Sequence, residues 1–158
     1  MTLTAEKITR QYFRKSRGSN VFQALKETDL TICSGRLTEI CGRSGSGKST
    51  LLNILAGLLE PTTGRVMYDG ADIYAMEDAE RSRFRNLSIG IIPQGQTGLH
   101  SLTVLENVTL PYVMYGEKAP DERAMELLEQ VGIAELASAY PNELSGGEMR
   151  RLSIARAM

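Results

Sequence analysis

The chain has 158 residues, of which 42% are hydrophobic, 23% are charged and 6% are aromatic. This length suits one domain, or one domain with a small appended subdomain, and it allows a real core. Lys and Arg number 18 and Asp and Glu number 19, so the net charge is −1 and wholesale electrostatic capture of nucleic acid or an anionic membrane is not expected. The two cysteines are too few for a disulfide framework or a four-cysteine zinc site, and no apolar run approaches the ~20 residues that cross a bilayer.

The N-terminal third is typical of β-strands. Apolar residues alternate with polar ones in segments 3–12 and 24–32, with a basic, turn-like stretch at 14–20 between them. Segment 37–41 (LTEIC) predicts a short strand that places Cys41 in a buried position. After Gly47 the apolar residues recur at helical spacing, and the helix is expected to end by Gly57 and Pro61.

The remaining elements divide into strands before Pro93 and helices after it. Segments 65–68 and 87–92 predict strands, separated by a charged helix near 78–85. Four helices are expected beyond Pro93, over 103–114 (bent or broken at Pro111), 121–131, 133–139 and 147–158. The pattern indicates a strand-rich base with one crossover helix, followed by a helical insertion.

A phosphate-binding loop is the strongest local signal. The stretch Gly42-Arg-Ser-Gly-Ser-Gly-Lys-Ser-Thr50 fits G-x-x-x-x-G-K-[ST] between a predicted strand and a predicted helix. Glycines let successive N–H groups converge on phosphate oxygens, Lys48 supplies charge for the β- and γ-phosphates, and Ser49 offers a hydroxyl to Mg²⁺. The alternative interpretation, a flexible Gly/Ser turn, does not explain why Lys48 and Ser49 stand at the start of an apolar helix. The predicted nucleotide-binding residues of this loop are Gly42, Ser44, Gly45, Gly47, Lys48, Ser49 and Thr50.

A second glycine motif decides between nucleotide-binding families. Leu144-Ser-Gly-Gly-Glu148 precedes the last helix, and it resembles the LSGGQ-type signature of the ABC (ATP-binding cassette) ATPases. The order also matches: phosphate loop, then Gln94 ending an apolar stretch, then the signature about 50 residues on. Ser145 with Glu148 equally fits a helix capping box, and both interpretations can hold together.

The resemblance implies a fold and a division of the chain. The fold class is α/β, a P-loop NTPase (RecA-like) ABC ATPase core with an N-terminal antiparallel β part and a helical subdomain. Residues 1–93 would form the ATP-binding core, 94–143 the Q-loop and helical subdomain, and 144–158 the signature and the start of its helix.

The resemblance also assigns roles to individual residues. Gln94 would contact Mg²⁺ and the attacking water, and Thr50 would contact the α-phosphate. Tyr12, with Phe13 as its neighbour, would stack on adenine. The signature residues Ser145, Gly146, Gly147 and Glu148 would close over the ATP that the phosphate loop of a second subunit holds, so a homodimer or a paired ABC subunit is implied.

The sequence departs from the family pattern after the signature helix. In ABC ATPases the next segment carries Walker B with the catalytic Glu, and later the switch histidine; none of these is found in the 158 residues, and His100 lies too early to be that histidine. The C-terminal strands of the core are missing in the same way. We therefore predict that this chain alone hydrolyses ATP very slowly or not at all.

The resemblance implies that the chain is the ATP-binding subunit of an ABC transporter and uses ATP and Mg²⁺. It would drive a separate integral membrane permease from the cytoplasmic face of the membrane. No nucleic-acid partner is expected. Segment 106–111 (ENVTLP) and the residues after it resemble the lipoprotein-release and macrolide-efflux subgroup, which favours export. One alternative is an ATP-binding module without turnover. Another is a non-transport ABC protein that acts on ribosomes or DNA. A kinase or GTPase would leave LSGGE unexplained.

Overall fold

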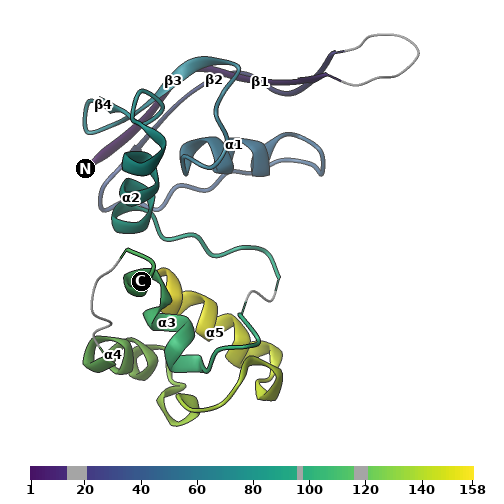
Figure 1. Ribbon diagram of the computed structural model, residues 1–158. Coiled ribbons are helices and arrows are strands. Elements are labelled where there is room, and N and C mark those ends of the chain that lie inside the picture. Colours follow the sequence, from purple (N-terminus) through teal and green to yellow (C-terminus); the bar gives the residue numbers. More distant parts are fainter. Residues whose placement is uncertain (14–20, 96–97, 116–120) are drawn as a thin grey trace. The chain divides into compact units, whose positions relative to one another are not determined.

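The structure, a computed structural model, describes residues 1–13, 21–95, 98–115 and 121–158. It divides into two compact units, Met1–Arg85 and Asn86–Met158, which are described separately (Figure 1). The turn predicted at 14–20 lies outside the described residues. The functional division at residues 93 and 143 stays a prediction.

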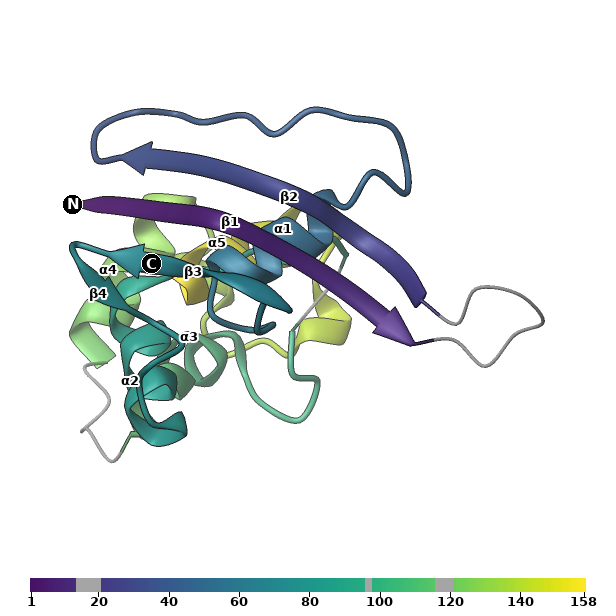
Figure 2. The ribbon, with the colours of Figure 1, turned by 90° about the horizontal axis from the view of Figure 1, so that it is seen from above.

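The first unit is built on an antiparallel sheet, as the sequence predicts. Strands β1 (Thr2–Phe13), β2 (Val21–Cys33), β3 (Thr63–Tyr68) and β4 (Ala71–Asp72) lie in the order β2-β1-β3-β4 (Figure 2). Ala5 of β1 pairs with Leu30 on one side and with Val66 on the other, which makes β1 a central strand.

Helix α1 (Lys48–Leu55) supplies the core of this unit. Its residues at positions 51, 54 and 55 are buried in one cluster with residues of the sheet, because a spacing of three and four places them on one side of a helix. The buried core consists of Ala5, Ile8, Leu25, Leu51, Ile54, Leu55, Val66 and Ile73. Helix α2 (Asp78–Ser88) is charged and has no buried residue.

The second unit is helical. Helices α3 (Val104–Val113), α4 (Asp121–Val131) and α5 (Gly146–Ala157) pack together, with short 3₁₀ turns at Ala134–Leu136 and Pro141–Glu143. The core is formed by Val104, Val108, Ala124, Leu127, Leu128, Ile133, Met149, Leu152 and Ala155. Helix α3 continues through Pro111 and is not broken there.

Two predicted strands are wrong. Segment 37–41 is irregular and Leu37 is 99% exposed, while α2 extends to Ser88 and residues 89–93 are irregular. A strand needs a lateral partner for its backbone N–H and C=O groups, and in the described part of the chain no strand pairs with either segment. Cys41 is consequently exposed rather than buried. Among the helices of the described residues, none has the length and apolar character to cross a membrane.

Candidate functional site

The loop before α1 has a backbone that requires glycine. Gly45 and Gly47 have φ values of 78° and 92°, in the left-handed region that L side chains rarely adopt. At Gly47 a Cβ would also lie 2.5 Å from the carbonyl oxygen of Ala24 in β2. The loop therefore enters α1 directly beside the second strand, and glycine at position 47 permits that approach.

The N-terminus of α1 is open for an anion. Gly47 is the N-cap and offers no side-chain hydrogen bond, and the first turn contains no acidic residue. The Leu51 amide donates to the Gly47 carbonyl at 2.8 Å, so regular helical bonding begins only there. Free N–H groups and the positive end of the helix dipole favour a phosphate at this point. Ser49 is exposed in this turn and Thr50 is half-buried.

Lys48 is held over the loop by its own backbone. Its Nζ donates to the carbonyl oxygens of Gly42 at 2.7 Å and Arg43 at 2.9 Å. The ammonium group therefore lies at the phosphate loop. A strongly charged phosphate oxygen is a better acceptor than a neutral carbonyl, and it would compete for the same hydrogens.

The opposite end of α1 is anchored by two side chains that the sequence analysis missed. The Tyr74 hydroxyl lies 2.6 Å from the Ile54 carbonyl oxygen and 2.7 Å from that of Leu59, and it donates to this pair. Arg85 donates to the carbonyl of Gly57 at 3.0 Å. Burial raises the pKa of Tyr74 to about 12. No local pattern signals these contacts, because they join residues 15 to 28 positions apart.

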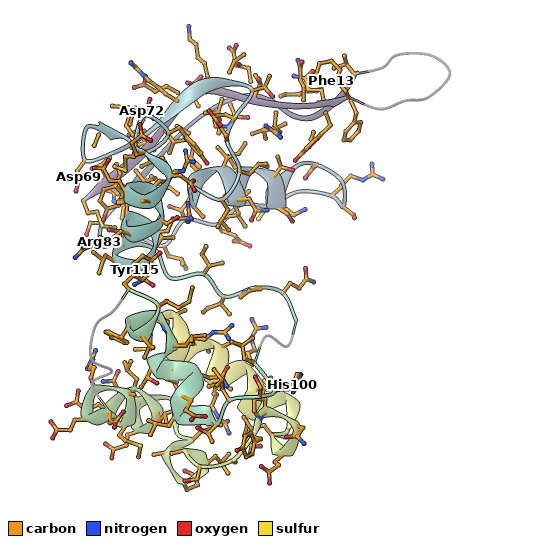
Figure 3. The ribbon with its side chains drawn as sticks, in the orientation of Figure 1. Phe13, Asp69, Asp72, Arg83, His100 and Tyr115 are labelled. Carbon is orange, nitrogen blue, oxygen red and sulfur yellow. The ribbon has the colours of Figure 1, made fainter. Side chains whose placement is uncertain are left out.

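Tyr12 lies near the end of β1 with one ring face covered. The Arg10 guanidinium stacks 4.7 Å from its ring centroid and also donates to the Glu60 carbonyl at 2.7 Å. Tyr12 is 38% exposed, whereas the neighbouring Phe13 is 86% exposed. Phe13 lies at the end of the strand (Figure 3). Tyr12 pairs across the strands with Phe22, two residues before the Ala24 carbonyl that Gly47 approaches. Arg10 and Tyr12 are two residues apart in one strand, so their side chains lie on the same face of the sheet, and this spacing was the sequence signal for their contact.

The signature lies at the N-terminus of α5 as a complete capping box. The Ser145 backbone N–H and hydroxyl donate to the Glu148 carboxylate at 2.7 and 2.8 Å, and the Glu148 N–H donates back to Ser145 Oγ. These hydrogen bonds to Ser145 lower the pKa of Glu148. Gly146 and Gly147 are exposed, and a Cβ at Gly147 would meet no atom within 4 Å. The capping interpretation is thus present in the structure, and it leaves the glycine backbone open.

The structure divides the predicted site residues between its two units. The phosphate loop and Tyr12 belong to the first unit, whereas Gln94 and the signature belong to the second. Gln94 is exposed on an irregular segment. His100 lies in a loop of the second unit (Figure 3).

The residues present fit a Mg²⁺ ion that arrives with a nucleotide. In the described ranges there is no group of three or more His, Cys, Asp or Glu side chains that could hold a metal by itself. Mg²⁺ commonly takes only one or two protein oxygens and completes its shell with phosphate oxygens and water. The exposed Ser49 hydroxyl beside an open phosphate site is suited to that limited role.

Comparison with known proteins identifies the family. The model of the ABC transporter family matches residues 25–158. The chain belongs to this family of ATP-binding cassettes, as the two glycine motifs imply.

Individual relatives agree with this assignment. The chain is 42% identical over 147 residues to the ABC transporter ATP-binding protein YtrE of Bacillus subtilis, covering 91% of this chain and 63% of that protein. It is 46% identical over 146 residues to the lipoprotein-releasing system ATP-binding protein LolD of Bacteroides thetaiotaomicron, covering 91% and 66% respectively. The chain thus spans about two thirds of the length of these relatives.

Solved structures give the same family. The dimeric structure of MJ0796, a bacterial ABC transporter cassette, superposes on this chain with a TM-score of 0.88 at 35% sequence identity. The superposition covers 99% of this chain and 68% of the MJ0796 chain. A post-hydrolysis dimer of MJ0796 bound to ADP and Pi has a TM-score of 0.86 at 36% identity. The predicted fold class is confirmed, and nucleotide binding is a property of the family to which the chain belongs.

Proposed function

We propose that this chain is the ATP-binding part of an ABC transporter and that it holds ATP through the phosphate loop at residues 42–50. The observation that carries the proposal is the N-terminus of α1. Its amides lack a side-chain cap, no acid lies in its first turn, and the Lys48 ammonium is already positioned over the loop.

Each residue of the loop would have a distinct task. The backbone amides of residues 45–50 bind phosphate oxygens, and Lys48 exchanges its carbonyl partners for the β- and γ-phosphates. Ser49 gives its hydroxyl to the Mg²⁺ that neutralises phosphate charge, and Thr50 contacts the α-phosphate. Tyr12 offers its exposed ring face to adenine, while Arg10 covers the other face.

A second copy, or a paired ABC subunit, would complete the site. Ser145, Gly146, Gly147 and Glu148 present an open helix N-terminus that would close over the ATP of the partner, with Gln94 reporting the state of the nucleotide. The support is the exposure of Gly146 and Gly147 and the dimeric state of the MJ0796 cassette.

The transport role is proposed from the family and from LolD. We place the chain at the cytoplasmic face of a membrane, bound to an integral membrane permease and coupling ATP binding and hydrolysis to export. The support for export is the similarity of segment 106–111 to the lipoprotein-release subgroup and the identity to a LolD protein.

Thermal unfolding of the full chain against Mg-ATP concentration tests the binding proposal. A ligand that binds only the folded state stabilises it by about 2.7 kcal/mol at one hundred times Kd. The transition is expected to rise with ATP in the parent and in the control Lys26→Ala, an exposed lysine of β2, but not in Lys48→Ala. An equal rise in Lys48→Ala would place the nucleotide elsewhere.

Turnover is a separate question with its own measurement. Phosphate release by the full chain is compared between the parent and Lys48→Ala. The prediction of very slow or absent hydrolysis holds if the two rates are the same, and it is wrong if the parent is faster.

A further inference from the structure

The guanidinium group of Arg10 is held in place by contacts on two sides. It lies 4.7 Å from the centroid of the Tyr12 ring, and its Nη1 donates to the Glu60 carbonyl at 2.7 Å. Its Nε is buried and has no hydrogen-bond partner among the residues that the structure describes. Burial of a donor without a partner costs free energy, so folding alone does not explain an arginine at this position.

The positive charge of Arg10 is available to the ring. None of the ion pairs within the described ranges includes Arg10, and the group that accepts its hydrogen bond is a neutral carbonyl. A cation is attracted to the negative face of an aromatic ring, most strongly where water is excluded. The contact therefore restricts the rotamers of Tyr12, a side chain that is 38% exposed near the end of its strand.

The Glu60 carbonyl connects this contact to the phosphate-loop helix. Glu60 directly follows Leu59, and the Leu59 amide donates to the Asn53 carbonyl of α1 at 3.1 Å. The hydrogen bond from Arg10 thus ends on a segment that is itself bonded to α1. Arg10 thereby links the Tyr12 ring to the helix that begins at the phosphate loop.

The phosphate loop also lies beside the strand that pairs with Arg10. Arg10 pairs across the sheet with Leu25 of β2, and a Cβ at Gly47 would lie 3.5 Å from Leu25 Cδ1. All of these residues belong to the first unit. The position of the Tyr12 ring relative to the loop is therefore set within one compact part of the chain.

We infer that Arg10 is a positioning residue for the base of the nucleotide and that it gives the site a preference for a nucleoside triphosphate over inorganic polyphosphate. It acts through Tyr12, because the guanidinium on one face of the ring fixes the other face to receive the base. Phosphate binding at the loop does not depend on it. The inference rests on the proposed stacking of Tyr12 on adenine, and it adds the residue that makes this stacking effective.

Calorimetry of the full chain with Mg-ATP and with Mg-tripolyphosphate, at one ionic strength, tests the inference. Tripolyphosphate has no base, so it reports on the phosphate loop alone. In Arg10→Met the Kd for ATP is expected to rise about tenfold, while the Kd for tripolyphosphate stays within about twofold of the parent. Lys26→Met removes one positive charge from an exposed position of β2 and is the matched control.

Two comparisons separate positioning from a merely structural or long-range role. In the background of Tyr12→Leu, Arg10→Met should weaken ATP binding no further, because its effect passes through the ring. Arg10→Lys keeps the charge but loses the planar group that stacks on the ring. Its Kd for ATP is therefore expected to rise about threefold, less than that of Arg10→Met.

Each outcome decides the role of Arg10. A loss of affinity that is specific to ATP and disappears in Tyr12→Leu supports it. Unchanged binding of ATP, equal weakening of ATP and tripolyphosphate, or a loss that persists in Tyr12→Leu overturns it. If Arg10→Met does not fold, Arg10→Lys decides by the same criteria. If the parent binds neither ATP nor tripolyphosphate, the proposed function itself fails, and the role of Arg10 fails with it.

Discussion

Removal of one hydroxyl tests how the phosphate-loop helix is held. In Tyr74→Phe the ring stays but the donor to the Ile54 and Leu59 carbonyls is lost. Ile54 O keeps the Gly57 amide as a partner at 3.1 Å, so chiefly the Leu59 carbonyl loses its bond. One lost hydrogen bond with a partly desolvated acceptor costs about 1–2 kcal/mol. For a unit of this size, the shift in Tm is about 4–8 °C per kcal/mol.

The assay is thermal unfolding followed by circular dichroism, with Tyr68→Phe as the matched control. The Tyr68 hydroxyl donates to the Met1 sulfur at 2.7 Å, and because sulfur is a weak acceptor the removal of this hydroxyl should change Tm little. A Tm for Tyr74→Phe equal to that of the control would refute the anchoring of α1 by Tyr74.

The pH dependence of the same variant gives an independent check. The pKa of Tyr74 rises from 10.0 to about 12 on folding, mainly through burial. The neutral phenol is therefore favoured in the folded state, and its contribution is complete below pH 10 and is lost as the pH rises towards 12. The stability difference between parent and Tyr74→Phe should shrink over that interval; a constant difference would contradict the assigned pKa.

Three further substitutions have defined outcomes. Gly47→Ala combines left-handed backbone strain of about 1–2 kcal/mol with a clash against the Ala24 carbonyl. It should weaken Mg-ATP binding, measured by calorimetry, more than the control Gly35→Ala, because Gly35 also has a left-handed φ of 72° but open space around its Cβ position. Equal affinities of the two variants would refute the close approach of Gly47 to Ala24. Asn107→Ala removes the partner of the Leu99 amide and of the Leu102 carbonyl, whereas the Leu99 and Thr103 carbonyls keep the Leu102 and Asn107 amides as donors. The variant should cost about 2–3 kcal/mol in urea unfolding, and a loss under about 1 kcal/mol would show that water replaces the side chain. Glu148→Ala should lower Tm at neutral pH. Because folding lowers the pKa of Glu148, the difference in Tm between parent and variant should vanish as the pH falls below 4.5, the ordinary pKa of Glu. A difference in Tm that persists at lower pH would exclude the carboxylate as the cap.

The sequence correctly predicted the elements whose formation depends on residues close to one another in the chain. The helix over 121–131 has the predicted bounds, because an acidic first turn and a following glycine mark its two ends. The glycine backbone of the phosphate loop and the Ser145–Glu148 capping box also follow from neighbouring residues alone.

Features that depend on distant partners were not predictable in the same way. Segments 37–41 and 87–92 have strand-like composition, but a strand forms only where another backbone lies alongside it. The Tyr74 anchor and the hydrogen bond from Arg10 to Glu60 join residues brought together only by the fold. Asn107 was seen in the sequence as part of ENVTLP, yet its polar side chain gave no sign that it would be completely buried.

The proposed function depends on binding of the ATP phosphates by the amides at the start of α1. Its most direct test is a titration of the ¹⁵N-labelled full chain with Mg-ATP, followed by amide chemical shifts. Saturable shifts are expected to concentrate at Gly45, Gly47, Lys48 and Ser49 and to be lost in Lys48→Ala. Shifts that are absent at these amides, or equally present in Lys48→Ala, would contradict it.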